Sequence, residues 1–180
     1  MRSTRTVIAV VLVGFVGGCG LPGNGPSAQD NEAALKVGDP APPLTVDKWI
    51  QGAEVRSFVP GQVYVIEFWA TWCGPCIKEM SHLDEYQAKY KNEGVTIIGF
   101  TPDMFNSADE VTAFLGQKHP RPGYTFAHET GRVTYDAYMK AAGQSGVPCS
   151  FVVDRAGRIA YIGHPTYLDD VLPKVVAGTR

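Results

Sequence analysis

The most informative stretch of the chain is VYVIEFWATWCGPC, residues 63–76. Its β-branched and aromatic first half, interrupted by Glu67, is typical of a central strand that is buried on both faces. After Cys73 the pattern changes, and apolar residues recur at helical spacing at Ile77, Met80, Leu83, Tyr86 and Tyr90. Gly94 predicts that this helix ends near residue 92. The sequence therefore predicts a buried strand followed at once by a helix that begins at two cysteines.

The position of these cysteines predicts redox chemistry. Cys73 and Cys76 are separated by two residues, so they can close a small disulfide ring and reopen it without deforming the fold. Backbone N–H groups at a helix N-terminus are unpaired, and together with the helix dipole they favour a thiolate on the first cysteine. We therefore expect Cys73 to be the nucleophile and Cys76, one turn further along and more buried, to be the resolving thiol. Pro75 lies in the first helical turn, where its missing N–H is tolerated.

Composition and charge exclude other classes of function. The 16 basic and 18 acidic residues give a net charge of −2, so the chain offers no basic face for nucleic acid. A hydrophobic fraction of 44% is enough for one compact domain rather than a disordered chain. The other two cysteines, Cys19 and Cys149, are isolated, and the four histidines form no paired ligand motif. We therefore expect neither a metal ion nor an organic cofactor.

The remaining pattern predicts an α/β fold with a mixed central sheet that helices cover on both faces. A second buried strand is expected at residues 95–100, and Ser107 with Glu110 forms a capping box for a helix that ends near Gln117. Further expected elements are a helix over 132–142, a hairpin of strands 150–154 and 158–162, and a last helix over 167–176. Two short strands are expected before this core, at residues 44–46 and at about 54–58.

The N-terminal residues predict export. Residues 1–18 combine Arg2 and Arg5 with an apolar run that is too short to cross a bilayer, as in a signal peptide. The run Val16-Gly17-Gly18-Cys19 resembles the lipobox of bacterial lipoproteins, although Val16 stands where that motif usually has Leu. This resemblance implies that Cys19 carries a lipid. Ordinary signal cleavage, which would leave Cys19 as an incidental thiol, is the alternative.

Domain boundaries follow from the composition beyond Cys19. Residues 19–36 begin with a stretch rich in Gly, Pro and polar residues that has no hydrophobic period, so we expect a flexible tether there. Residues 37–180 then form the folded domain. Two acyl chains on one cysteine are enough for stable anchoring, so we expect a membrane-anchored lipoprotein outside the cytoplasm.

The run from Glu67 to Cys76, together with Gly146-Val147-Pro148 further on, resembles the thioredoxin superfamily. The closer resemblance is to membrane-anchored extracytoplasmic thiol–disulfide oxidoreductases of the TlpA, ResA and CcmG type, and it covers roughly residues 37–180. It implies a thioredoxin-like fold with an N-terminal β-hairpin extension. It also implies an enzyme that exchanges its own dithiol for the disulfide of a partner protein. Cytochrome c maturation is the usual role of this subgroup, but no residue here specifies such a substrate.

The resemblance assigns roles to individual residues. Cys73 and Cys76 match the redox disulfide of the family, and Pro148 matches a proline that the family holds in the cis form. Trp72, Val147 and Pro148 are expected to bind the substrate. The Val147 backbone would pair with the substrate chain like an added strand.

Two other residues near the motif are candidates for the same site. Glu67, six residues before Cys73, matches a buried carboxylate that accepts the proton of the second cysteine. Because burial disfavours the charged form, the pKa of Glu67 should be raised. Cys149 directly follows Pro148 and is either a third redox-active thiol or a small buried hydrophobic residue, and the second interpretation is favoured.

The expected partners are a disulfide-containing protein substrate and a membrane or soluble thiol electron donor, and the protein is expected to be a monomer. Gly74-Pro75 between the cysteines resembles thioredoxin, which favours reduction of the substrate over its oxidation. Three alternatives stay open. A peroxiredoxin-like enzyme would need Pro and Thr at the positions of Ile66 and Ala70. A copper-handling relative would space its cysteines by three residues, and a non-catalytic binding module would keep the fold alone.

Overall fold

The computed structural model describes residues 34–118 and 121–179 of the protein. The predicted signal peptide (residues 1–18), Cys19 and the tether as far as residue 33 lie outside the described residues. Within 34–118 and 121–179, no helix is both long enough and apolar enough to span a bilayer.

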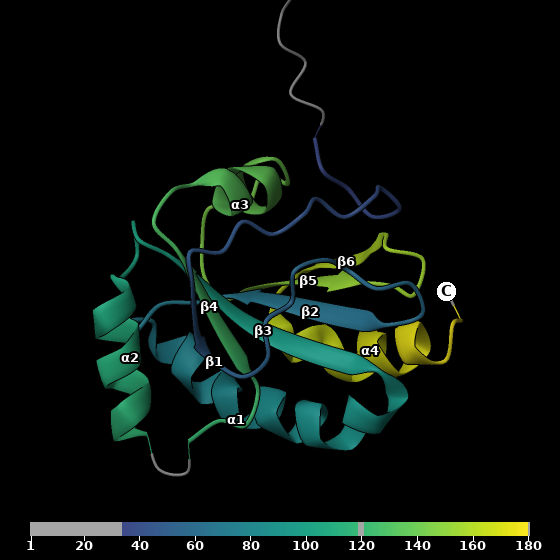
Figure 1. Cartoon of the computed structure of the whole chain (residues 1–180). Coiled ribbons are helices and arrows are strands. Elements are labelled where there is room, and N and C mark those ends of the chain that lie inside the picture. Colours follow the sequence, from purple (N-terminus) through teal and green to yellow (C-terminus); the bar gives the residue numbers. More distant parts are fainter. Residues whose placement is uncertain (1–33, 119–120, 180) are drawn as a thin grey trace, which may run out of the picture. The chain divides into compact units, whose positions relative to one another are not determined.

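Six strands of the described residues form one mixed sheet in the order β1-β4-β3-β2-β5-β6 (Figure 1). β2, β3 and β4 are parallel, whereas β1, β5 and β6 pair antiparallel with their neighbours. The strands are β1 (Lys48–Gln51), β2 (Val63–Phe68), β3 (Val95–Pro102), β4 (Thr125–Glu129), β5 (Cys149–Val153) and β6 (Ile159–Gly163). The predicted mixed sheet is confirmed, and β2, which leads into the two cysteines, lies in its interior.

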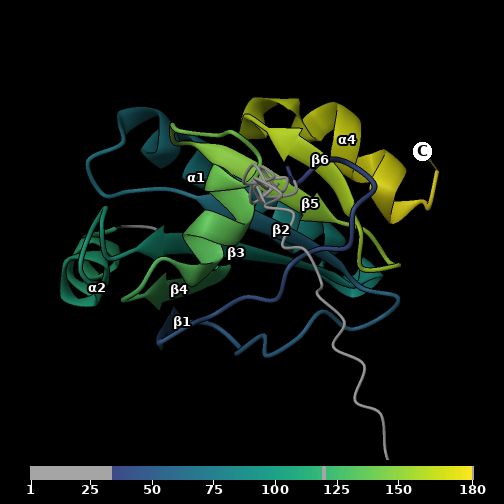
Figure 2. The same cartoon turned by 90° about the horizontal axis from the view of Figure 1, so that it is seen from above.

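Helices cover both faces of this sheet. α1 (Gly74–Tyr90) and α4 (Leu168–Val176) lie on one face, and α3 (Val133–Tyr135), continued by a π-helical turn over Asp136–Lys140, lies on the other (Figure 1). Figure 2 views the sheet from the α3 side. α2 (Ala108–Gln117) contributes Val111 and Leu115 to the apolar cluster on the α1 face. Short 3-10 turns lie at Lys91–Glu93, before β3, and at Pro165–Tyr167, before α4.

Alternation along β2 decides which side chains can reach the cysteines. All six residues of β2 are buried. The cluster on the α3 face holds Tyr64, Ile66 and Phe68, and the cluster on the α1 face holds Val63, Val65 and Trp69. Because successive strand residues point to opposite faces, Glu67 points to the α1 face. The acidic residue and the helix that carries the cysteines therefore share one side of the sheet.

The ends of the helices follow local signals in the sequence. Cys73 is the N-cap of α1, Pro75 lies in its first turn, and Gly94 adopts a left-handed φ of 80° where the helical segment ends. At the start of α2, the Ser107 hydroxyl accepts from the Glu110 N–H and the Glu110 carboxylate accepts from the Ser107 N–H. The predicted capping box is confirmed.

β4 was not predicted, because its sequence TFAHE contains polar residues that do not follow the apolar pattern of a buried strand. All five of its residues are buried, including His128 and Glu129. His128 Nε2 lies 3.0 Å from the Asn106 carbonyl oxygen, and the Glu129 carboxylate accepts from the backbone N–H groups of Thr134 and Tyr135, each at 2.9 Å. These polar side chains satisfy their hydrogen bonds through tertiary contacts, so they break the apolar pattern without leaving the sheet.

The predicted N-terminal β-hairpin is wrong. Residues 44–46 and 54–58 form no strands, and β1 between them pairs antiparallel with β4 at the sheet edge. Their apolar side chains instead pack against the cluster on the α3 face, at Leu44, Val46, Val55 and Phe58. These residues are apolar because they pack over a face of the sheet, and not because they form strands that pair with it. Leu35, expected in the tether, also joins the domain through a hydrogen bond from its N–H to the Ala141 carbonyl oxygen at 2.8 Å.

Candidate active site

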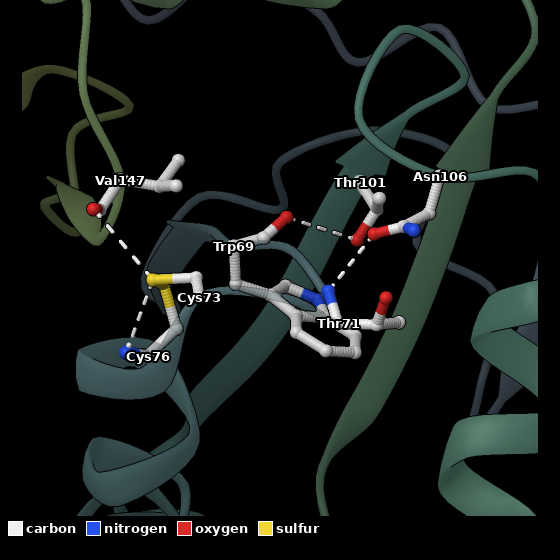
Figure 3. The surroundings of a disulfide bond; sticks show 7 residues. All are labelled: Trp69, Thr71, Cys73, Cys76, Thr101, Asn106 and Val147. Atoms are coloured by element: carbon white, nitrogen blue, oxygen red, sulfur yellow. Dashed lines mark hydrogen bonds between the residues drawn. A yellow bond between two sulfur atoms is a disulfide. The ribbon is translucent and has the colours of Figure 1, made fainter.

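The two cysteines form a disulfide at the N-terminus of α1. The S–S distance is 2.05 Å and the Cα atoms lie 5.2 Å apart. Both residues are buried. The Cys73 sulfur accepts a hydrogen bond from the Cys76 backbone N–H at 3.2 Å (Figure 3). This N–H, with the positive end of the helix dipole, can stabilise negative charge on Cys73 once the disulfide is reduced.

The Val147–Pro148 segment lies directly against Cys73. Its peptide bond is cis, as predicted. The Val147 carbonyl oxygen lies 3.6 Å from the Cys73 sulfur, opposite the helix N-terminus (Figure 3). β5 begins at Cys149 and pairs antiparallel with β2. The sheet therefore brings together two motifs that are about seventy residues apart in the sequence.

The loop between β2 and α1 is held by residues that sequence reasoning missed. The Asn106 side-chain oxygen accepts from the Thr71 N–H at 2.8 Å, and Thr101 Oγ1 donates to the Trp69 carbonyl oxygen at 3.3 Å (Figure 3). Both partners come from the end of β3 or the loop after it. β2 and β3 are parallel neighbours, so their carboxyl ends meet at one sheet edge. The sequence offered one signal for these two residues, because both are polar and follow the predicted strand 95–100.

Trp69 and Trp72 occupy opposite environments. Trp69 is 2% exposed and lies in the cluster on the α1 face. Trp72 is 63% exposed beside Cys73. Its indole N–H donates to the Phe105 carbonyl oxygen at 3.1 Å, and the two rings meet edge to face with centroids 6.0 Å apart. The exposed ring is thus held in one place next to the disulfide, where it can contact a bound chain.

Glu67 is buried and carries an unusual pKa. Its side chain is 2% exposed, and burial raises its pKa from 4.5 to about 8. A hydrogen bond from Ser150 opposes this rise, and the negative charge of Glu79 on α1 adds to it. Ser150 Oγ donates to Glu67 Oε2, whereas Oε1 has no hydrogen-bond partner among the described residues. A carboxyl group with this pKa can take up or release a proton near neutral pH.

Replacing Glu67 by glutamine should stabilise the protein at alkaline pH. The carboxyl titrates near 4.5 in a solvated chain and near 8 in the folded protein, so folding favours its protonated form. The stability linked to this group is fully present below about pH 4.5, is lost as the pH rises toward about 8, and stays lost above that. At about pH 9, Glu67→Gln should therefore exceed the wild type in free energy of unfolding by a few kcal/mol.

Urea unfolding of the oxidised proteins at about pH 5 and about pH 9 measures this difference. Glu110→Gln is a matched control, because that carboxylate lies exposed at the capping box of α2 and its pKa is lowered by hydrogen bonds from Ser107. Identical pH dependence for wild type and Glu67→Gln would contradict a raised pKa.

Cys149 lies apart from the disulfide. Its side chain belongs to the cluster on the α3 face, whereas Cys73 and Cys76 belong to the cluster on the α1 face. It is a free thiol, and burial raises its pKa to about 12. A thiol with this pKa is almost entirely protonated at neutral pH and is a poor nucleophile. The geometry supports the interpretation of Cys149 as a small buried hydrophobic residue.

A disulfide at a helix N-terminus that follows a central strand of a mixed sheet, with a cis-proline segment directly against it, defines a thioredoxin-fold dithiol protein. A family model described as Redoxin matches residues 36–170. Thiol-disulfide oxidoreductase ResA of Bacillus anthracis is 32% identical over 179 residues, which cover 95% of this chain and 94% of the relative. Protein FixW of Rhizobium leguminosarum is 34% identical over 151 residues, covering 81% of this chain and 68% of the relative. The chain belongs to the redoxin family and is a thiol–disulfide oxidoreductase of the ResA type.

Solved structures agree with this fold. A putative protein disulfide isomerase from Bacteroides thetaiotaomicron superposes with a TM-score of 0.66 at 24% identity, covering 79% of this chain and 91% of that one. A putative thiol:disulfide interchange protein DsbE from Chlorobium tepidum gives a TM-score of 0.61 at 23% identity, covering 79% and 99%. The predicted thioredoxin-like fold is confirmed.

Proposed function

We propose that this protein reduces disulfide bonds of other proteins outside the cytoplasm, cycling Cys73 and Cys76 between dithiol and disulfide. The observation that carries the proposal is the Cys73–Cys76 disulfide at the N-terminus of α1, where the Cys73 sulfur accepts the Cys76 N–H. The Gly74-Pro75 dipeptide between the cysteines supports the reducing direction through its likeness to thioredoxin.

The reaction proceeds in two exchanges. The Cys73 thiolate attacks one sulfur of the substrate disulfide, that bond breaks, and the other substrate sulfur leaves and takes up a proton. A mixed disulfide now joins Cys73 to the substrate. Cys76 then gives its proton to Glu67 and attacks the Cys73 sulfur. The bond between Cys73 and the substrate breaks, and the second substrate sulfur leaves and takes up a proton, so that the substrate is released as a dithiol. The enzyme ends with the Cys73–Cys76 disulfide, having delivered two electrons, and a thiol donor must return them.

The substrate chain binds beside the nucleophile in this proposal. Trp72 offers an exposed ring, and the Val147–Pro148 segment offers backbone groups 3.6 Å from the Cys73 sulfur. An extended substrate segment can pair with this backbone as an added strand while its cysteine faces Cys73. Main-chain pairing accepts many sequences, which suits a reductase that acts on proteins.

Export and anchoring complete the proposal. The basic and apolar pattern of residues 1–18 supports translocation, and the lipobox-like run that ends at Cys19 supports a lipid anchor. The folded domain would then act as a monomer at the outer side of the membrane that holds it. No observation in residues 34–118 or 121–179 favours the peroxiredoxin-like, copper-handling or non-catalytic alternatives.

The test is to trap the mixed disulfide by replacing Cys76 with serine. Reduced Cys76→Ser mixed with insulin should accumulate a covalent adduct through Cys73, because no second thiol is present to resolve it. Mass spectrometry of the unreduced and reduced samples locates the bond and shows its release by dithiothreitol.

Cys149→Ser is the matched control, since it removes the other thiol of the described residues and should form no stable adduct. Absence of the adduct with Cys76→Ser, or an adduct that persists when Cys73 is also replaced by serine, would contradict the proposed roles of the pair.

A further inference from the structure

Ser150 is the direct partner of Glu67 across the sheet. The two residues face each other in the antiparallel pairing of β2 and β5, so their side chains lie on the same side of the sheet. Ser150 is fully buried, and its hydroxyl donates to Glu67 Oε2. Ser150 also stands two residues after Pro148, on the strand that begins at the substrate segment. Residues 147–150, which lead into β5, therefore carry both the backbone that faces the substrate in the proposal and the partner of the carboxyl group.

Within residues 34–118 and 121–179, the other ionisable groups whose charges act on Glu67 are acids. They are Glu79 from α1, Tyr124 before β4, Cys149 from β5 and Tyr161 from β6. Cys76, the thiol of the proposed proton transfer, lies on the same face of the sheet. Negative charge on any of the acids makes ionisation of Glu67 harder. Among the described residues, the Ser150 hydroxyl is the donor that stabilises the ionised carboxyl group.

The two carboxyl oxygens of Glu67 are therefore not equivalent. Oε2 already accepts the Ser150 hydrogen, whereas Oε1 is buried without a hydrogen-bond partner in the described part of the chain. A proton added to Oε2 would compete with the Ser150 hydrogen for the lone pairs of that oxygen, whereas a proton added to Oε1 leaves the Ser150 hydrogen bond undisturbed. Protonation at Oε1 is thus the arrangement that keeps every existing hydrogen bond.

We propose that Ser150 is a positioning residue that holds Glu67 Oε2, so that Oε1 is the oxygen that takes the proton from Cys76. This inference rests on the proposed role of Glu67. In the step, the Cys76 S–H bond breaks, the Oε1–H bond forms and no electrons are exchanged; the resulting thiolate then attacks Cys73. Ser150 also favours the ionised carboxylate that must be present before the transfer, because its hydrogen bond lowers the pKa that burial raises.

The test isolates the second exchange and follows its pH dependence. In the full chain carrying Cys19→Ser and Cys149→Ala, reduced and freed of reductant beforehand, an aromatic disulfide such as 5,5′-dithiobis(2-nitrobenzoate) reacts first with Cys73 and releases one coloured thiolate. The attack of Cys76 then releases a second. Ser150→Ala should move the pH midpoint of the second release upward by about one unit, the scale expected for one hydrogen bond to a charged group. The first release should be unchanged.

Three comparisons separate positioning from a loss of stability. Ser150→Thr keeps a hydroxyl and should restore the midpoint. Thr134→Val removes another fully buried hydroxyl, which donates to the Thr45 carbonyl oxygen, and should leave the midpoint in place. In a Glu67→Gln background, Ser150→Ala should cause no further shift. Ser150→Gly gives a second deletion of the hydroxyl if Ser150→Ala folds poorly.

The outcomes distinguish this inference from the proposed function. If Glu67→Gln alters the second release but both deletions of the Ser150 hydroxyl leave its midpoint unchanged, the role of Ser150 is overturned and that of Glu67 stands. If Glu67→Gln itself has no effect, the carboxyl group is not the proton acceptor and the inference falls with it.

Discussion

Cys73→Ser should abolish reduction of insulin, with a loss of at least about a thousandfold, as expected when an enzyme loses its nucleophile. The serine hydroxyl is not ionised at neutral pH, so the groups at the N-terminus of α1 have no thiolate to stabilise. Cys76 cannot replace it, because Cys76 lies one turn further into the helix, whereas Cys73 is the N-cap residue that faces the unpaired N–H groups. Precipitation of reduced insulin, measured by light scattering with dithiothreitol as donor, follows the rate.

Cys149→Ser is the matched control for this loss. It also removes one sulfur close to the site in sequence, but the Cys149 side chain belongs to the cluster on the α3 face. The control should therefore keep nearly the full rate. A Cys73→Ser protein that still reduces insulin above the background of dithiothreitol would contradict the assignment of the nucleophile.

Trp69→Ala should lower the free energy of unfolding by about 3–5 kcal/mol, a large part of the roughly 5–15 kcal/mol that holds a typical domain together. Trp69 is almost wholly buried, and its ring packs against Phe114 and Phe126 with centroids 5.6 and 5.4 Å apart. Removing it opens a cavity on the α1 face beneath the loop that leads to Cys73. Urea unfolding monitored by far-ultraviolet circular dichroism measures the change.

Trp72→Ala provides the comparison within the same motif. The same side chain, three residues further on, is mostly exposed, so its removal should change the free energy of unfolding by no more than about 0.5 kcal/mol. It should instead raise the KM for insulin while leaving the reaction with a small aromatic disulfide nearly unchanged. Equal losses of stability in the two variants would contradict the difference in burial on which both expectations depend.

Local signals made much of the fold predictable. The β2–α1 junction, the capping box at Ser107 and the hairpin of β5 and β6 all depend on residues close together in the sequence, and all three form. β4 was missed because His128 and Glu129 find their hydrogen bonds in distant segments. The N-terminal strands were predicted wrongly, because residues such as Leu44 and Phe58 are buried without pairing. Burial can be read from the sequence more readily than strand pairing.

In the functional site, too, residues with a local sequence signal were predicted and residues that act through contacts between distant segments were missed. The predicted residues Glu67, Cys73, Cys76 and the Val147–Pro148 segment come together around the N-terminus of α1 and the neighbouring strands. Asn106 and Thr101, which hold the loop before Cys73, were missed. Ser150 was also missed as a partner of Glu67, since that contact depends on the register of β5 against β2. A sequence pattern gives the reactive groups but not the groups that orient them.

The most direct test of the account is the ionisation of Cys73 in the reduced protein. In full-length Cys76→Ser carrying Cys19→Ser and Cys149→Ala, the rate of alkylation by iodoacetamide is measured against pH. We predict that Cys73 titrates well below the ordinary cysteine value of about 8.5, because the helix N-terminus stabilises its thiolate. A titration at about 8.5 or above would contradict it.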